Sequence, residues 1–184
     1  MTGVQTCALP IFFDNIRALF GKADEGHEPI NANELIRDVV TGFQGDLEQH
    51  EITARVKLQE DLPKIVAHKG QLHEVLINLV RNAIEAMQAD KNDHRALQVS
   101  SERHDGDKII LSIEDSGPGI DPKHAENIFE AFVTTKSHGT GLGLAFCRMI
   151  IERHSGELSV SPAQPHGSIF RIALPIFARD EKSE

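Results

Sequence analysis

The chain has 184 residues, of which 40% are hydrophobic and 26% are charged, and its formal net charge is −9. A chain of this length fits one globular domain with short flanking segments and can bury a substantial core. The acidic balance, without any run of lysine or arginine, excludes the basic surface of a typical nucleic-acid-binding protein. No apolar run approaches the roughly 20 residues that span a bilayer, so we expect no direct membrane contact.

Both ends of the chain differ in character from its middle. Residues 1–11 follow no periodic pattern, whereas residues 12–20 carry apolar side chains at helical spacing, and the pattern stops at Gly21. We therefore expect three parts. Residues 1–26 would contain a non-native-looking start, a remnant helix and a linker. Residues 27–177 would form the folded domain, and residues 178–184 would form a charged tail.

Neither the cysteines nor the histidines form a metal-binding pattern. Cys7 and Cys147 lie far apart in the sequence, which favours neither a disulfide framework nor a zinc site and suits a reducing cytoplasm. The ten histidines are scattered, and His68 with His73 is a poor ligand pair because five positions separate them. We expect no metal other than Mg²⁺.

The first half of the domain predicts a helix, a strand and a second helix. Capping side chains in Asn31-Ala-Asn-Glu34 predict a helix that runs to about Gln49. Apolar and polar residues alternate over 52–59, which predicts a half-buried strand. Its buried face would carry Ile52, Ala54, Val56 and Leu58. Apolar residues at helical spacing from His68 to about Ala89 predict a long core-facing helix.

The second half predicts strands around a loop and a helix. Alternating segments at 97–99 and 109–113 predict a hairpin with a turn at 104–107. A short helix from Asp121 to about Phe129 and a loop to Gly143 follow. A helix over 142–154 and strands over 157–161 and 168–174 end the domain. This order predicts an α+β fold, a two-layer α/β sandwich.

The long helix predicts a polar face that could meet a ligand. Glu74, Asn78, Asn82 and Glu85 follow one another at spacings of four, four and three residues, opposite the apolar stripe. An amide oxygen is a suitable ligand for Mg²⁺, and Asn82 or Asn78 could supply one. The alternative is an ordinary solvated helix face.

The segment Asp115-Ser-Gly-Pro-Gly119 is a candidate site for a purine base. Asp115 ends a strand with an apolar inward face, so its carboxylate would lie at the rim of the core, where it can accept the exocyclic amine of a purine. Gly117 and Gly119 remove side chains that would block a flat base. The alternative is an ordinary Asp-Gly turn.

The segment Gly139-Thr-Gly-Leu-Gly-Leu144 is a candidate phosphate site because it opens a helix whose unpaired N–H groups favour an anion. The polar residues before it argue against a dinucleotide-binding fold, which needs a buried strand there. Lys136, with the hydroxyls of Thr134, Thr135 and Thr140, could reach polyphosphate oxygens. A solvated lysine is the alternative.

Taken in order, four motifs resemble the successive nucleotide-binding boxes of histidine kinase catalytic domains, in the superfamily that also holds the gyrase, mismatch-repair and chaperone ATPases. The motifs are Asn78-Leu-Val-Arg-Asn82-Ala, Asp115-Ser-Gly-Pro-Gly119, Phe129-Glu-Ala-Phe132 and Gly139-Thr-Gly-Leu-Gly143. The resemblance covers about 27–175 and closes with Gly167-Ser-Ile-Phe170. It implies the Bergerat ATP-binding fold, a mixed and mainly antiparallel sheet with helices on one face and ATP held under a lid.

The resemblance also implies roles for individual residues. Asn82 would coordinate Mg²⁺, Asp115 would bind the adenine amine, and Phe129 with Phe132 would steady the lid. Catalysis would depend on Asn78, Asn82 and Lys136. The nucleotide would be held by Asn78, Asn82, Asp115, Gly117, Gly119, Lys136, Gly139, Thr140, Gly141, Leu142, Gly143 and Leu144.

The residue type at position 78 distinguishes enzymes that transfer the phosphoryl group from enzymes that hydrolyse ATP. The ATPases of the superfamily carry a glutamate at the matching position, and an amide cannot take a proton from water as a general base. By the resemblance, ATP would instead phosphorylate a histidine on a dimerisation domain, of which residues 12–20 would be the last turns. The parent would be a homodimer that serves a response regulator. Two alternatives share the fold: a serine kinase of the anti-sigma-factor type and a nucleotide-binding regulatory module without catalysis.

Overall fold

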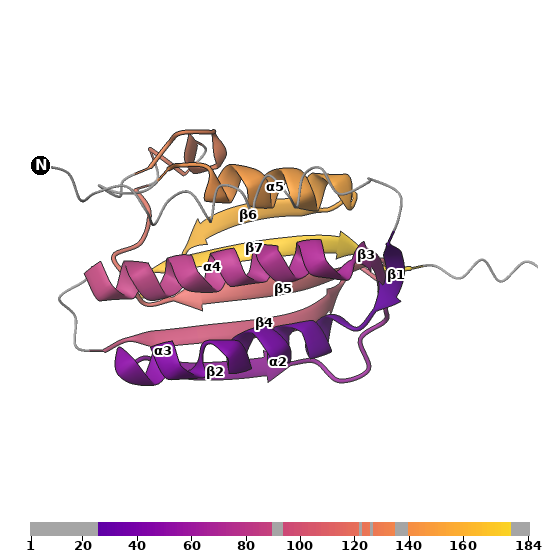
Figure 1. Cartoon of the computed structure of the whole chain (residues 1–184), viewed down its shortest axis with the longest axis horizontal. Coiled ribbons are helices and arrows are strands. Elements are labelled where there is room, and N and C mark those ends of the chain that lie inside the picture. Colours follow the sequence, from indigo (N-terminus) through magenta and orange to yellow (C-terminus); the bar gives the residue numbers. More distant parts are fainter. Residues whose placement is uncertain (1–25, 90–93, 122, 126, 135–139, 178–184) are drawn as a thin grey trace, which may run out of the picture.

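The computed structural model describes residues 26–89, 94–121, 123–125, 127–134 and 140–177. Its elements divide into a helix layer and a sheet layer (Figure 1). In chain order they are β1 (His27–Ile30), α2 (Ala32–Gly42), α3 (Gln44–Gln49), β2 (Thr53–Leu58), β3 (Ile65–His68), α4 (Lys69–Ala89), β4 (Ala96–His104), β5 (Lys108–Asp115), the 3₁₀ helix η1 (Asn127–Phe129), α5 (Gly143–Arg153), β6 (Glu157–Pro162) and β7 (Ser168–Pro175).

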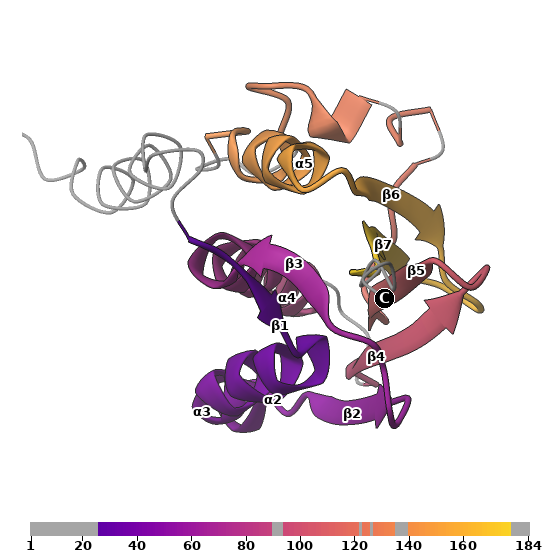
Figure 2. The ribbon, with the colours of Figure 1, turned by 90° about the vertical axis from the view of Figure 1, so that its right-hand side faces the viewer.

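The main sheet has five strands in the order β2-β4-β5-β7-β6. Only β2 and β4 are parallel, and the other pairs are antiparallel. The helices α2, α4 and α5 lie on one face of this sheet (Figure 2). The expected α+β two-layer sandwich, with a mixed and mainly antiparallel sheet, is therefore confirmed, as are the long helix and the hairpin.

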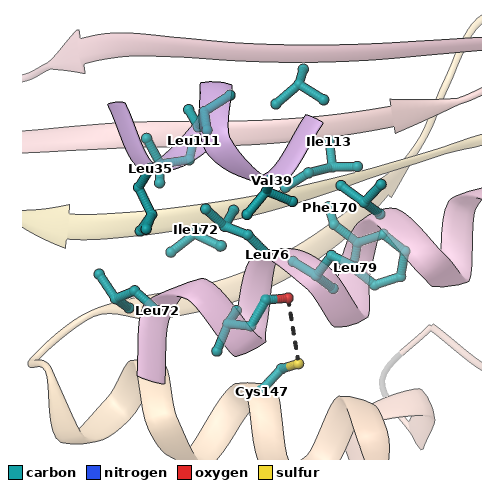
Figure 3. Close-up of a cluster of buried hydrophobic side chains, with 14 of the residues drawn as sticks. Leu35, Val39, Leu72, Leu76, Leu79, Leu111, Ile113, Cys147, Phe170 and Ile172 are labelled. Carbon is teal, nitrogen blue, oxygen red and sulfur yellow. Dashed lines mark hydrogen bonds between the residues drawn. The ribbon is translucent and has the colours of Figure 1, made fainter. Parts of the chain in front are cut away.

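The core lies between α4 and the central strands. Leu76 and Leu79 of α4 face Leu111 and Ile113 of β5, and each of these side chains is at most 2% exposed (Figure 3). Alternation along β5 places Ile109, Leu111 and Ile113 inward, as the sequence pattern predicts. Within the described residues, no helix has the length and apolar character needed to cross a membrane.

The predicted helix from Asn31 to Gln49 is two helices rather than one. Asn31 caps α2 by accepting hydrogen bonds from the backbone N–H groups of Asn33 and Glu34, as expected. The helix ends at Gly42, and Phe43 leaves the helical conformation at φ −96° and ψ 4°. Glycine is a poor helix former, which explains the break, and α3 starts again directly afterwards.

The prediction of a half-buried strand at 52–59 was wrong about burial. A strand forms there as β2, and Ile52 is buried just before it, but Ala54 is exposed and Val56 is 43% exposed. The reason is that β2 is an edge strand, paired on one side only with β4. Within β2 itself, only Leu58 of the predicted face is partly buried.

Two further differences concern short elements. The expected helix from Asp121 to Phe129 is reduced to η1, while Pro122 and Glu126 lie outside the described residues. The strands β1 and β3, which the sequence pattern did not predict, form a separate antiparallel pair with His27 opposite His68. This pair leads directly into α4.

Candidate nucleotide-binding site

The two asparagines of α4 face each other across one helical turn. The Asn82 side-chain amide donates to the Asn78 side-chain oxygen at 2.9 Å, and both residues are half-buried. Leu79 and Ala83 on the other face are at most 3% exposed. The predicted separation of a polar and an apolar face is therefore confirmed for this pair, while Glu74 is exposed and Glu85 is half-buried.

Asp115 lies at the end of β5, as predicted, and its side chain is 4% exposed. Its Oδ1 accepts a hydrogen bond from the Gly117 backbone N–H at 2.8 Å. Burial raises the pKa of this carboxyl from 3.8 to about 6. Backbone N–H groups of Gly117 and Ser168 oppose this rise in pKa, Glu114 adds to it, and His166 opposes it.

Two glycines are packed too closely around Asp115 to carry side chains. A β-carbon on Gly117 would lie 2.9 Å from Asp115 Oδ1 and 3.2 Å from the Ala86 β-carbon. Gly167 has φ +113°, and its β-carbon would lie 1.9 Å from the Asp115 backbone oxygen. The sequence predicted Gly117 as a site residue but placed Gly167 only in the closing strand.

Strand pairing explains how Gly167 and its neighbours reach Asp115. In the β5–β7 register Asp115 lies opposite Ser168, although 53 positions separate them in the sequence. His166 places its Nδ1 3.3 Å from the Gly117 carbonyl oxygen. Gly119, at φ +80°, has its β-carbon position 3.0 Å from the Gly167 oxygen. Residues 166–168 therefore lie beside Asp115 and Gly117, which the sequence did not predict.

The predicted phosphate-binding segment 139–144, which we call the glycine segment, is described from Thr140 to Leu144 and leads into α5. The N-cap residue of α5 is Leu142, whose side chain makes no capping hydrogen bond, so the leading N–H groups of this helix receive no cap from that residue. Gly141 adopts φ +66°, and its carbonyl accepts the Phe132 backbone N–H at 2.9 Å. A β-carbon on Gly141 would lie 2.5 Å from the Phe132 backbone. These features suit an anion at the start of α5.

The structure joins the candidate regions along one face of α4. A β-carbon on Gly143 would lie 2.9 Å from Asn78 Nδ2, so the start of α5 abuts Asn78. Asn82 follows one turn later, and Ala86, another turn on, contacts the Gly117 position. At a rise of 1.5 Å per residue, the span from Asn78 to Ala86 is about 12 Å. Asp115 therefore lies at one end of this row of α4 residues, and the glycine segment lies at the other end.

The two phenylalanines differ in their packing. Phe129 is 9% exposed, meets Phe170 edge to face at a centroid distance of 6.4 Å, and carries the Arg148 guanidinium 5.5 Å above its ring. Phe132 is 77% exposed and has φ +69°. Phe129 is therefore anchored in the core, whereas Phe132 is tied to the glycine segment only through its backbone among the contacts described.

Lys136 and Gly139, both predicted site residues, lie outside the described residues, as does Thr135. Among the residues that are described, no three His, Cys, Asp or Glu side chains gather as metal ligands. Mg²⁺ commonly takes one or two protein oxygens and completes its shell with waters and phosphate oxygens. The amide pair of α4 fits that manner of binding.

Comparisons with known proteins agree with this geometry. Residues 67–177 match the family of histidine kinase-, DNA gyrase B- and HSP90-like ATPases. The chain is 38% identical over 149 residues to the sensor protein TdiS of Thauera aromatica, covering 80% of this chain and 27% of that protein. It is 36% identical over 154 residues to the sensor histidine kinase ZraS of Salmonella typhimurium, covering 84% of this chain and 32% of that protein.

Solved structures give the same result. The catalytic domain of histidine kinase ThkA superposes with a TM-score of 0.73 at 34% identity, over 82% of this chain and 95% of that one. Full-length ShkA in complex with AMPPNP superposes with a TM-score of 0.78 at 27% identity, over 91% of this chain and 36% of that one. The chain belongs to the family of histidine kinase catalytic, ATP-binding domains, and it spans about a third or less of the length of TdiS and ZraS.

Proposed function

We propose that this domain binds ATP along α4 and transfers the γ-phosphoryl group to a histidine on a dimerisation domain. The single observation that carries the proposal is the continuous line from Asp115 through Ala86, Asn82 and Asn78 to Gly143. A buried carboxylate lies at one end of this line, and the start of α5, which the Leu142 side chain does not cap, lies at the other. A purine nucleotide has the matching polarity, with an amine at one end and phosphates at the other.

Each end of the line has its own chemistry. Asp115 accepts the exocyclic amine of adenine, and Gly117, which has no side chain, lets its backbone pack against Asp115 and Ala86 beside the base. The N–H groups at the start of α5, together with Lys136, bind the phosphate oxygens. Mg²⁺, held by Asn82 and the phosphates, would neutralise charge on the transferred group.

Asn78 slows hydrolysis and so keeps ATP available for transfer to a protein acceptor. Its amide cannot remove a proton from water, so bound ATP persists until an imidazole nitrogen reaches the γ-phosphorus. A phosphorus–nitrogen bond then forms and the bond to the bridging oxygen of ADP breaks. Positioning and charge neutralisation supply most of the rate in such reactions.

The relatives support a place in two-component signalling. TdiS and ZraS are named as sensor proteins, and ThkA was solved in complex with the response regulator TrrA. That complex superposes on this chain with a TM-score of 0.72 at 26% identity. We propose that a response regulator receives the phosphoryl group in turn and that the parent is a homodimer with this domain in the cytoplasm.

The test is phosphoryl transfer in trans. The chain is incubated with Mg²⁺ and ATP labelled at the γ-phosphate, with and without the dimerisation domain of its parent protein. We expect little label on the chain alone and acid-labile label on the added domain. An otherwise identical domain with its acceptor histidine replaced by glutamine is the matched control. Acid-stable phosphoserine would contradict the proposal and favour a serine kinase.

A further inference from the structure

His154 joins three elements at the end of the domain opposite the glycine segment. It follows the last residue of α5, and its side chain is 5% exposed. Its Nδ1 lies 2.7 Å from the Ile150 carbonyl oxygen, and its Nε2 accepts the His68 backbone N–H at 3.0 Å. Because the backbone N–H of His68 can only donate, the ring proton must sit on Nδ1, where it is donated to Ile150. This arrangement requires the neutral ring.

His68 is the residue at which β3 passes into α4. Its own Nδ1 accepts the Gln71 backbone N–H at 3.3 Å, within the first turn of α4. His154 therefore connects the end of α5 to the start of α4. The helix α4 carries Asn78, and α5 begins at Gly143. The hydrogen bond of His154 therefore helps to fix the relative position of the two helices that form the candidate nucleotide site.

Three of the contacts between α4 and α5 mark the length of their packing, which we call the α4–α5 seam. Gly143 abuts Asn78 at the nucleotide end. Cys147 lies in the middle, with its sulfur 4.0 Å from the Val75 carbonyl oxygen (Figure 3). His154 holds the far end. Of these three described contacts, the one at His154 has a side chain whose charge changes near neutral pH.

We propose that His154 is a positioning residue for nucleotide binding: its neutral ring fixes α5 along α4, and protonation of the ring loosens the α4–α5 seam. This inference rests on the nucleotide site proposed above. A protonated ring would carry a second N–H that points at the N–H of His68, so the hydrogen bond would be replaced by two opposed donors. The start of α5 would then lose its fixed distance from Asn78.

The surroundings of His154 disfavour the charged ring. Burial is the first cause that lowers its pKa below 6.5, and His27, His68 and Arg153 lower it further. The His27 ring of β1 lies 5.0 Å from the His154 ring between centroids. Four charged side chains near the ends of the surrounding elements are exposed, namely Glu28 on β1, Lys69 on α4, Glu152 on α5 and Glu157 on β6. Farther along α4, His73 and Glu85 are half-buried and Glu74 and Arg81 are exposed, as is Arg148 on α5.

The sign of the effect follows from the lowered pKa. The folded chain binds fewer protons than the unfolded chain between the folded pKa and 6.5, so stability falls as the pH falls through this window. Above pH 6.5 the contribution is fully present. Acid should therefore loosen this end of the domain.

The experiment compares His154→Gln and His154→Ala with the wild-type chain. Glutamine places an acceptor oxygen near the Nε2 position and stays neutral at every pH, whereas alanine removes the contact. At pH 8, His154→Ala should weaken ATP binding by roughly 3- to 30-fold, and His154→Gln should restore it. Between pH 8 and pH 5.5, the unfolding midpoint of the wild type should fall about 2 to 4 °C further than that of His154→Gln.

His50→Gln is the matched control, because His50 ends α3 beside the edge strand β2 and contributes its backbone carbonyl to Arg95. Its pH profile should follow the wild type. Parallel pH profiles for wild type and His154→Gln would overturn the inference, as would unchanged ATP affinity in His154→Ala. If His154→Ala does not fold, the pH dependence of the unfolding midpoint in wild type and in His154→Gln tests the inference. A wild type that does not bind ATP at pH 8 would instead overturn the proposed function.

Discussion

Replacing Asp115 by alanine is expected to weaken adenine binding by about 1 to 3 kcal/mol, a loss of roughly 5- to 150-fold in affinity. The exocyclic amine of the base would be buried without its acceptor, and a buried donor without a partner is costly. Calorimetric titration with ATP and with adenosine measures the loss. Asp38→Ala, at an exposed position of α2, is the matched control and should bind like the wild type.

The pH dependence of the same carboxyl gives a second measurement on Asp115. Its pKa is raised to about 6 in the folded chain, so the folded state binds more protons than the unfolded state between pH 3.8 and about 6. Stability from this group therefore falls as the pH rises through that window and stays reduced above it. A rise of about two pKa units corresponds to about 3 kcal/mol at neutral pH.

Asp115→Asn removes this titration and keeps the size of the side chain. The free energy of unfolding of the variant minus that of the wild type should be larger at pH 7.5 than at pH 5 by on the order of 1 kcal/mol, because only the wild type loses stability over this range. Adenosine carries no phosphate to titrate, and its affinity for the wild type should fall below pH 6. Unchanged adenosine affinity in Asp115→Ala would contradict the assignment of the base to Asp115. A stability difference independent of pH would contradict the raised pKa of Asp115.

Gly167→Ala is expected to destabilise the domain by on the order of 4 kcal/mol. Two causes add: a positive φ of +113°, which side chains rarely adopt, and a β-carbon 1.9 Å from the Asp115 backbone oxygen. Such a loss is a large part of the roughly 5 to 15 kcal/mol that stabilises a typical domain. Urea unfolding followed by circular dichroism measures it. The fraction that remains folded should also bind ATP weakly, because the Asp115 backbone must move.

Gly45→Ala is the matched control for this prediction. Gly45 lies in α3, and a β-carbon there meets nothing within 4 Å. Alanine favours a helix over glycine by about 1 kcal/mol, so this variant should be as stable as the wild type or more stable. A Gly167→Ala domain that unfolds at the wild-type urea concentration would show that the turn before β7 is not packed against Asp115.

The parts of the fold that the sequence predicted well have local periodic patterns. The helix α4 keeps its apolar spacing over 21 residues, and β4 with β5 alternates on both sides of a short turn. The position of Asp115 followed from the same alternation, because the buried face of β5 continues to its last residue. The pairing of Asn78 with Asn82 followed from helical spacing alone.

The parts that the sequence did not predict depend on contacts between distant segments. Gly167 reaches Asp115 only through the β5–β7 register, which no local pattern contains. The pair β1–β3 consists of two four-residue strands whose sequences, HEPI and IVAH, do not alternate between apolar and polar residues. The exposure of β2 depends on its place at the sheet edge, which its alternation could not reveal. Close approaches such as Gly143 to Asn78 need the packing of two helices.

The central claim is that one nucleotide lies along α4, with its base at Asp115 and its phosphates at the start of α5. Backbone amide NMR of the chain, titrated in turn with adenosine and with Mg²⁺ and AMPPNP, tests it directly. Adenosine should shift the amides of Gly117 and Ser168 and leave Gly141 to Leu144 unchanged, whereas AMPPNP should shift both groups. Shifts confined to the open face of the sheet, or identical shifts from both ligands, would contradict it.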